Sequence, residues 1–136
     1  MPVEDDASLR ELLEYGTVAV VGCSSNPRKD AHRIPRYLLE RGYEIVPVNP
    51  TAEEIFDRRA YDSLSKVEEE VDLVNVFRPS EEVAGIVDEA LDREDVRAIW
   101  TQLGIEDSEA ARRAEEEGLT VVQNRCIKAE HWRLVG

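Results

Sequence analysis

The sequence contains few cysteines and histidines, and it has no long hydrophobic run. Its two cysteines, Cys23 and Cys126, are too few for a disulfide framework among 136 residues. No apolar run approaches the ~20 residues that a membrane helix needs. The acidic segment from Met1 to Asp6 lacks the basic and apolar regions of a signal peptide. We therefore expect a single domain over residues 1–136, a cytoplasmic location and no contact with a membrane.

Several catalytic and nucleotide-binding patterns are also absent. The dinucleotide fingerprint Gly-x-Gly-x-x-Gly would need glycine where Ser24 and Pro27 stand, and Asn49 replaces the acid that binds a ribose. The chain has no Walker-type Gly-Lys-Ser/Thr and no nucleophile elbow Gly-x-Ser-x-Gly. The two histidines, His32 and His131, belong to no cluster with metal-ligand spacing. The sequence thus predicts neither catalytic residues nor a metal site, and it disfavours a standard NAD site.

Positive charge is scarce. Thirty Asp and Glu residues oppose 17 Lys and Arg residues, which gives a formal net charge of -13. Only Lys29, Lys66 and Lys128 are lysines. This acidic, arginine-rich balance resembles that of proteins from salt-loving organisms, and an ordinary acidic cytosolic protein is the alternative. Either way, a surface of this charge disfavours a nucleic-acid partner.

The most informative stretch is residues 18–27, where an apolar run is followed by Gly22 and small polar residues. This order predicts a strand, a phosphate-binding turn and a helix, because backbone N–H groups in such a turn favour an anion. A basic segment follows at residues 28–41, with five bases against two acids. The bases are Arg28, Lys29, Arg33, Arg36 and Arg41. A basic segment beside this turn, in an otherwise acidic chain, predicts a phosphorylated ligand.

Strand and helix patterns alternate along the chain. Strands are expected at residues 17–21, 44–48, 71–77, 96–101 and 119–123. Helices are expected at residues 6–15, 31–41, 63–67, 80–92, 108–117 and 128–134. Residues 51–62 are expected to form a loop, with room for a short helical turn near residues 53–55. The alternation predicts an α/β fold, a Rossmann-like doubly wound, five-stranded parallel sheet with helices on both faces.

Local signals predict where several of these helices begin and end. The expected N-caps are Asp5 or Asp6, Ser63 and Ser80, and the expected C-terminal stops are Gly16, Gly42 and Gly118. Pro35 is expected in the first turn of its helix, where its missing N–H is tolerated.

In a sheet of this class, ligands bind outside the carboxyl ends of the strands, where the strand order reverses. The segments that follow the predicted strands are rich in small, amide and aromatic residues. They are Gly22 to Ser25, Asn49-Pro50, Phe77 to Ser80, Gln102 to Gly104 and Asn124 to Cys126. We expect the binding site to be built from these segments.

These segments resemble those of the small single-domain CoA-binding proteins, which are similar to the N-terminal CoA-binding domain of the succinyl-CoA ligase α subunit. The resemblance covers roughly residues 8 to 134. The motifs that carry it are Gly22-x-Ser24-x-Asn26-Pro27, Val46-Pro47-Val48-Asn49-Pro50, Val76-Phe77-Arg78, Trp100-x-Gln102-Leu103-Gly104 and Asn124-Arg125-Cys126. It implies a protein that binds CoA or an acyl-CoA as a small-molecule ligand.

The resemblance also implies which residues contact the ligand. The backbone amides of Gly22, Cys23, Ser24 and Ser25 would hold the pyrophosphate. Arg28, Lys29 and Arg33 would offset its charge. Val48, Asn49 and Pro50 would line the adenosine. Phe77, Arg78 and Pro79 would flank the adenine and the start of the pantetheine arm. Gln102, Leu103, Gly104, Asn124 and Cys126 would lie on the far side, where the arm leads.

Two departures limit what the resemblance implies. Asp30 and Ala31 stand where relatives have Pro and Ser, so one hydroxyl contact to phosphate is missing and a negative charge lies near the anion site. The ligase's phosphorylated-histidine domain is absent from the sequence, so ligase activity does not follow. CoA sensing, carriage or delivery remains, with a homodimer or another protein as the expected partner.

Two other classes of function stay open. One is an enzyme that acts on a bound acyl-CoA with Cys126 or Cys23 as nucleophile, which needs a lowered thiol pKa. The other is a sensor that binds NAD(H) or another nucleotide and signals through its oligomer contacts. The poor match to Gly-x-Gly-x-x-Gly counts against the second class.

Overall fold

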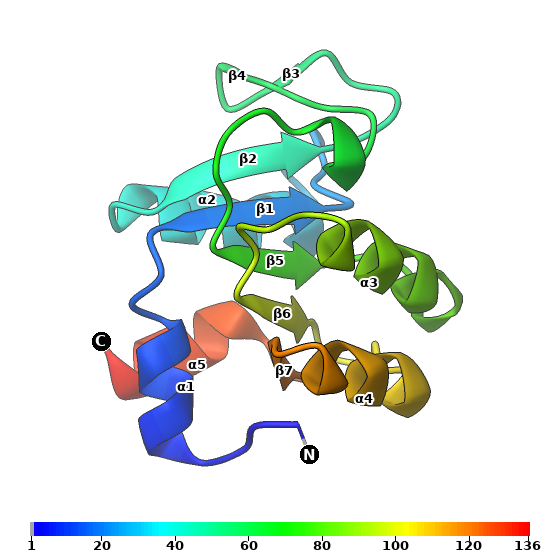
Figure 1. Ribbon diagram of the computed structural model, residues 1–136. Helices are drawn as coiled ribbons and strands as arrows, with labels where there is room; N and C mark the ends of the chain where they lie inside the picture. The colour runs from blue at the N-terminus through cyan, green and yellow to red at the C-terminus, as the bar shows by residue number, and fades with distance from the viewer. Residues whose placement is uncertain (1) are drawn as a thin grey trace.

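A parallel sheet of five strands organises the chain in the computed structural model, which describes residues 2–136. The strands lie in the order β2-β1-β5-β6-β7 (Figure 1). They are β1 (Thr17–Val21), β2 (Glu44–Val48), β5 (Leu73–Val76), β6 (Ala98–Thr101) and β7 (Thr120–Val122). Every expected strand is present, and three of them are shorter than expected. The Rossmann-like α/β fold is confirmed.

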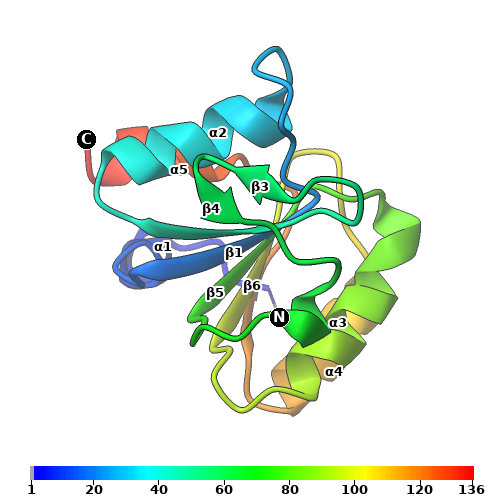
Figure 2. The ribbon, with the colours of Figure 1, turned by 90° about the horizontal axis from the view of Figure 1, so that it is seen from above.

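Helices cover both faces of this sheet, as Figures 1 and 2 show. One face carries α1 (Asp6–Leu12), α2 (Asp30–Glu40) and α5 (Ile127–Leu134). The other face carries α3 (Val83–Leu91) and α4 (Ser108–Glu116). The chain passes from one face of the sheet to the other twice, each time after a strand. The loops at the carboxyl edge of the sheet therefore lead to helices on both faces.

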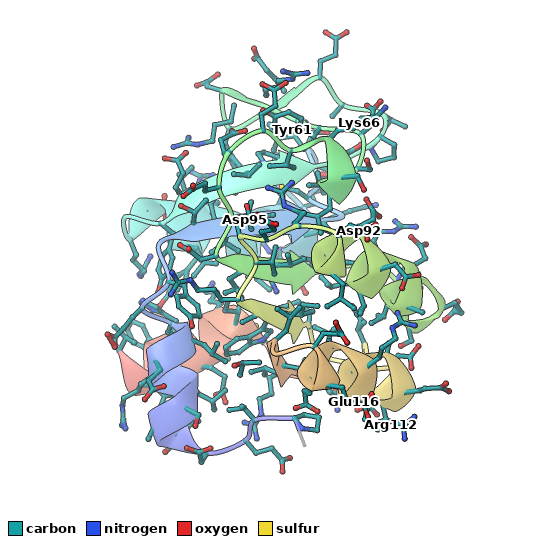
Figure 3. The ribbon with its side chains drawn as sticks, viewed as in Figure 1. Tyr61, Lys66, Asp92, Asp95, Arg112 and Glu116 are labelled. Carbon is teal, nitrogen blue, oxygen red and sulfur yellow. The ribbon has the colours of Figure 1, made fainter. Side chains whose placement is uncertain are left out.

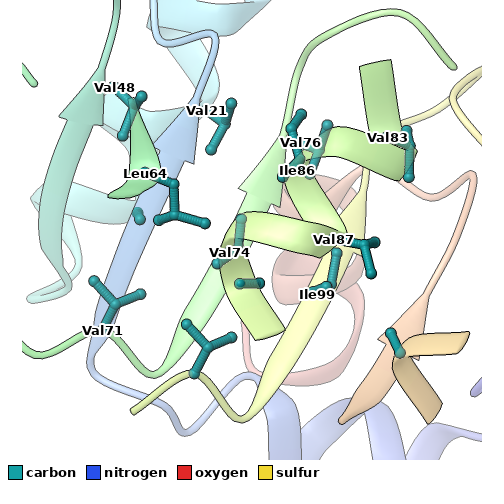
Figure 4. Packing of buried hydrophobic residues seen from close by; sticks show 14 of the residues in the cluster. Val21, Val48, Leu64, Val71, Val74, Val76, Val83, Ile86, Val87 and Ile99 are labelled. Atoms are coloured by element: carbon teal, nitrogen blue, oxygen red, sulfur yellow. The ribbon is translucent and has the colours of Figure 1, made fainter. Parts of the chain in front are cut away.

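Alternating residues of each strand supply the two cores. In β1, Val18 and Val20 point to the side of α2 and α5, whereas Ala19 and Val21 point to the side of α3. Figure 4 shows the second of these cores, where Val74 and Val76 of β5 meet Val87 of α3. Because both faces are covered, the strands are apolar throughout rather than alternating with polar residues.

A small hairpin replaces the helical turn considered near residues 53–55, and that expectation was wrong. Strands β3 (Glu54–Ile55) and β4 (Arg58–Arg59) pair antiparallel. Their turn places Phe56 and Asp57 at φ 58° and 60°. Two-residue hairpin turns require such angles and usually contain Asn-Gly, so the Phe-Asp pair does not signal this turn in the sequence.

The helix ends follow the expectations only in part. Asp5 caps α1 by accepting a hydrogen bond from the Ser8 N–H at 3.0 Å. The helix then ends at Leu12, before Gly16. Ser63 makes no side-chain cap to the short 3₁₀ helix η1 (Leu64–Lys66).

Ser80 was also predicted to cap a helix, and it does not. It begins the 3₁₀ helix η2 (Ser80–Glu82), and α3 starts only at Val83. The Ser80 hydroxyl instead accepts a hydrogen bond from the Glu106 N–H at 3.0 Å. This contact joins the loop after β6 to the loop after β5, and a local sequence pattern cannot reveal it.

The His131 side chain is buried between α5, α2 and the Tyr43 ring. Its Nδ1 lies 2.9 Å from the Tyr37 hydroxyl, and its ring makes edge contacts with Tyr37 and Tyr43. Two cations lie nearby, since Arg41 and Lys128 are both placed over the ring of Tyr37, which contacts His131. Burial, helped by the charge of Arg41, lowers the pKa of His131 from its ordinary 6.5.

This lowered pKa predicts an acid-sensitive stability. The unfolded chain binds the proton at a higher pH than the folded protein, so the stabilisation is complete above about pH 6.5 and declines as the pH falls below it. Urea unfolding at several pH values between about 7.5 and 5 measures the effect. The free energy of unfolding should fall more steeply for the wild-type protein than for His131→Gln. Equal pH dependence of the two proteins would contradict this assignment.

Candidate functional site

A cleft of about 560 Å³ opens at the carboxyl ends of β1, β2 and β5. The chain leaves β1 toward β2 on one side and returns to β5 on the other, so the cleft lies where the strand order reverses. Three loops contribute residues 21–24, 48–51 and 77–78 to its wall. This is the position that the sequence predicts for a ligand site.

Gly22 allows the loops after β1 and β5 to approach each other. Its φ is +91°, and a Cβ at this position would lie 2.9 Å from Arg78 Cδ and 3.3 Å from the Phe77 carbonyl carbon. The Gly22 N–H donates to the Val48 carbonyl at 3.0 Å, and the Phe77 N–H donates to the Val21 carbonyl at 2.9 Å. Only glycine satisfies both the angle and the space. These bonds tie together the ends of all three strands.

Ser24 is fixed to the first turns of α2. Its N–H donates to the Ala31 carbonyl at 3.0 Å, and its own carbonyl lies 2.7 Å from His32 Nδ1. The Ala31 carbonyl is available because Pro35, four residues later, has no N–H to offer it. Pro35 is the sixth residue of α2 rather than part of its first turn, which corrects the expectation. The helix tolerates it because the loop uses the carbonyl that it leaves free.

The hairpin β3–β4 supports this loop from outside. Phe56 at its tip packs on the His32 ring, with 4.6 Å between the ring centroids. His32 therefore holds the Ser24 carbonyl on one side and the hairpin on the other.

Three of the four loop amides assigned to phosphate are already used. The N–H groups of Gly22, Cys23 and Ser24 donate to the carbonyls of Val48, Val20 and Ala31. Within residues 22–31, the backbone N–H groups without a protein acceptor are those of Ser25, Asp30 and Ala31. Asp30 and Ala31 are the first two residues of α2. Two of the free donors thus lie at a helix N-terminus, beyond the loop to which the resemblance assigns the phosphate, and Ser25 is the one assigned loop amide that remains free.

Of the three bases assigned to phosphate, only Lys29 lines the cleft. It is the residue that precedes α2. Arg28 is exposed outside the cleft, and Arg33 pairs with Asp30 on the surface of α2. Both arginines therefore contribute charge to the neighbourhood rather than direct contacts.

Asn49 positions loops with both ends of its side chain. Its Nδ2 donates to the Cys23 carbonyl at 2.9 Å. Its Oδ1 accepts from the Thr51 N–H at 2.8 Å and from the Ala52 N–H at 3.1 Å. The side chain that follows β2 therefore holds the loop with Pro50 against the loop with Cys23, and these bonds use its oxygen and one of the two hydrogens on Nδ2.

Arg78 lines the cleft but is paired in two places with one carboxylate. Its Nε donates to Glu82 Oε1 at 3.0 Å and its Nη2 donates to Glu82 Oε2 at 2.7 Å. The pair raises the pKa of Arg78 and lowers the pKa of Glu82. Pro79, assigned to the ligand together with Arg78, is exposed outside the cleft wall.

Sequence reasoning missed the wall opposite the phosphate loop. Seven residues make this wall: Thr51, Asp62, Ser63, Leu64, Glu82, Ile86 and Glu89. The last three are spaced by four and three residues, as on one helix face, so the spacing after β5 could have found them. Residues 62–64 carry no such signal, because a long-range contact with β2 brings them here.

The residues assigned to the far side of the ligand do not line this cleft. Gln102 is buried, and its Oε1 accepts from Asn75 Nδ2 at 3.0 Å and from the Ile127 N–H at 3.1 Å. It therefore joins β5, β6 and the start of α5. The Gly104 N–H donates to Asn124 Oδ1 at 2.6 Å, which joins the loops after β6 and β7.

Cys126 and Asn124 line a second cavity, of about 620 Å³, at the end of β7. Leu103, 70% exposed, also lines it. Arg125 beside them pairs with the buried Glu130 at 2.7 Å. The loops after β1 and β7 are three strand spacings apart, roughly 15 Å. The predicted site residues are thus divided between the cleft and the second cavity, and Ser25, Arg28, Arg33, Pro79, Gln102 and Gly104 line neither.

The alternative that Cys23 acts as a nucleophile is not supported. Its side chain is completely buried, and burial raises the pKa of the thiol to about 12. Within residues 2–136, no three His, Cys, Asp or Glu side chains are grouped to hold a metal. In the same residues, no helix has the length and apolar character needed to cross a membrane.

Comparison with known sequences places the chain among relatives of two sizes. A family described as "CoA binding domain" matches residues 16–132. The uncharacterized protein YneT of Bacillus subtilis (strain 168) is 38% identical over 126 residues, which cover 92% of this chain and 93% of that protein. The ADP-forming acetate–CoA ligase II of Archaeoglobus fulgidus is 28% identical over 123 residues, which cover 88% of this chain but 18% of the ligase.

Solved structures share the fold. A hypothetical protein from Pyrococcus horikoshii OT3 has a TM-score of 0.93 at 35% identity, with 100% of this chain and 97% of that chain covered. The Thermus thermophilus protein cell-free ID.343 has a TM-score of 0.90 at 39% identity, with 96% and 99% covered. A dinucleotide-forming acetyl-coenzyme A synthetase of Ca. Korarchaeum cryptofilum has a TM-score of 0.69 at 30% identity, with 83% of this chain and 26% of the enzyme covered.

The difference in burial between the two cysteines predicts their reactivity. Iodoacetamide near neutral pH should alkylate the half-buried Cys126, whereas Cys23 should react more than about 100-fold more slowly because its thiolate is rare and inaccessible. Peptide mass spectrometry of the native protein over time measures both rates. In urea the two rates should converge. Faster modification of Cys23 in the native protein would contradict the described packing.

Proposed function

The chain belongs to the family of CoA-binding domains, and from this premise we propose that it binds CoA or an acyl-CoA at the carboxyl edge of its sheet. The observation that carries the proposal is the cleft at the reversal of strand order, lined at one end by Lys29 and by Ala31, whose backbone N–H has no acceptor within the protein. A diphosphate fits such an end, since a helix N-terminus attracts anions through its free N–H groups and its dipole.

The adenosine would lie between the loops after β2 and β5. Val48, Pro50 and Phe77 line the cleft there and offer apolar surface to a base. The side chain of Asn49 contributes by fixing the shape of this wall rather than by contacting the ligand.

The pantetheine arm would run along the edge of the sheet toward β7. The two cavities lie on that edge, roughly 15 Å apart. An extended arm can span this distance, which would bring the thiol or acyl end to the cavity lined by Leu103 and Cys126. This course would account for the matched residues Asn124 and Cys126, which line the second cavity rather than the cleft.

Binding and delivery fit the site better than catalysis. The acids in the cleft are engaged in ion pairs or hydrogen bonds: Asp62 with Lys66, Glu82 with Arg78, and Glu89 with Ser65. The acetate–CoA ligase is an enzyme in its own right, but the chain spans 18% of its length. We therefore propose a role in holding CoA for a partner, either a second copy of the chain or another protein.

Calorimetric titration of the purified protein with CoA tests the proposal. We expect a dissociation constant of about 1 to 100 μM, and we expect Lys29→Ala to weaken binding by about tenfold because Lys29 is the one base of the segment 28–33 that lines the cleft. The control is Arg112→Ala, which removes an equal charge from the exposed surface of α4 (Figure 3).

The titration is run at low and at high salt, because the net charge of -13 repels an anionic ligand at low salt. Circular dichroism shows that each sample is folded. Absence of CoA binding by a folded sample at both salt concentrations would overturn the proposal.

A further inference from the structure

A short segment beside β2 brings an acid to the adenosine end of the cleft. Tyr61 forms a parallel bridge with Val48, its N–H donates to the Pro47 carbonyl at 3.0 Å, and its carbonyl accepts from the Asn49 N–H at 2.8 Å. Tyr61 thus acts as a one-residue strand next to β2. Asp62 follows Tyr61 as Asn49 follows Val48, at the same edge of the sheet.

The Asp62 side chain is available to a ligand. It lines the cleft, and 61% of its side-chain surface is exposed. Its Oδ2 lies 3.2 Å from Lys66 Nζ, in an ion pair between two exposed groups that contributes little to stability. Among residues 2–136, no group donates a hydrogen bond to its Oδ1. Figure 3 shows the labelled Tyr61 and Lys66 that bracket this residue in the chain.

A carboxylate at this place favours a ribose with free hydroxyls over a ribose that carries a phosphate. In dinucleotide-binding folds, a carboxylate after the second strand accepts hydrogen bonds from the hydroxyls of the adenosine ribose, and a ribose phosphate requires a base there instead. The residue that follows β2 here is Asn49, an amide whose Oδ1 and Nδ2 already bond to protein groups. Asp62, one strand position further out, brings to that edge a carboxylate whose Oδ1 has no donor among residues 2–136.

The charges around Asp62 reinforce this preference. Glu82 and Glu89 lie on the same wall, and the two cations that line the cleft are Lys29 and Arg78. Lys29 is at the start of α2, and Arg78 is held by Glu82. A phosphate on the ribose, which carries a charge of about -1.5 to -2, would face these carboxylates, and the cation beside Asp62, Lys66, is already paired with it.

We infer that Asp62 makes the cleft selective for a ligand whose adenosine ribose carries no phosphate, so that dephospho-CoA binds more tightly than CoA. The inference rests on the proposed function, because it places the adenosine of a CoA-type ligand in this cleft. It assigns to Asp62 hydrogen bonds from the ribose hydroxyls and repulsion of a 3′-phosphate.

Parallel titrations of the full chain with dephospho-CoA and with CoA test the inference. We expect dephospho-CoA to bind about tenfold more tightly, since one carboxylate near a phosphate in partly screened surroundings produces an effect of this size. Asp62→Asn should bring the two affinities within about twofold of each other, by strengthening CoA binding and weakening dephospho-CoA binding. Asp92→Asn is the matched control, since it removes the same charge from an exposed position beyond the end of α3 and should leave the ratio unchanged.

The outcomes separate this inference from the proposed function. Equal or tighter binding of CoA by the wild-type protein overturns the inference and leaves the proposed function standing. A preference for dephospho-CoA that persists in Asp62→Asn overturns the role of Asp62. Binding of neither ligand by a folded sample overturns the proposed function itself, and the inference with it.

Discussion

The close contact between the loops after β1 and β5 is the constraint on which the rest of the site depends. Gly22 makes it possible, because any side chain at this position would collide with Arg78 or with the Phe77 backbone. The contact lets Phe77 and Val21 share a hydrogen bond and sets the floor of the cleft. The neighbouring groups are then fixed in turn: Asn49 holds the loop after β2, and the Ala31 carbonyl holds the loop after β1.

A consequence of this bonding is that the loop after β1 satisfies most of its own backbone donors. The N–H groups of Gly22, Cys23 and Ser24 support the loop, and the donors left for a ligand are those of Ser25 and of the first two residues of α2. The proline inside α2 takes part in this arrangement, since it releases the carbonyl that Ser24 uses. Pro35 breaks the hydrogen bonding inside the helix, and in doing so it contributes to the geometry of the site.

The fold was predictable from the sequence. For the site, the sequence predicts the edge of the sheet at which it lies, but not all of the residues that line it. Apolar runs and their spacing predict every strand of the five-stranded sheet and the main helices, because burial on both faces of the sheet leaves a strong pattern. The hairpin at Phe56 and the placement of Asp62 depend on a non-glycine turn and on a contact with β2, which no local pattern records. Gln102 was assigned to the ligand on resemblance, whereas its amide joins two strands to α5. Long-range hydrogen bonds decide which polar side chains remain free.

The central claim is that the diphosphate of a CoA-type ligand binds at the start of α2. Amide chemical shifts of ¹⁵N-labelled protein, followed during titration with CoA, test it most directly. The account predicts that the largest changes occur at Ser25, Asp30 and Ala31, whose N–H groups have no acceptor within the protein. Changes confined to residues 123–129 at the second cavity, with the start of α2 unaffected, would contradict it.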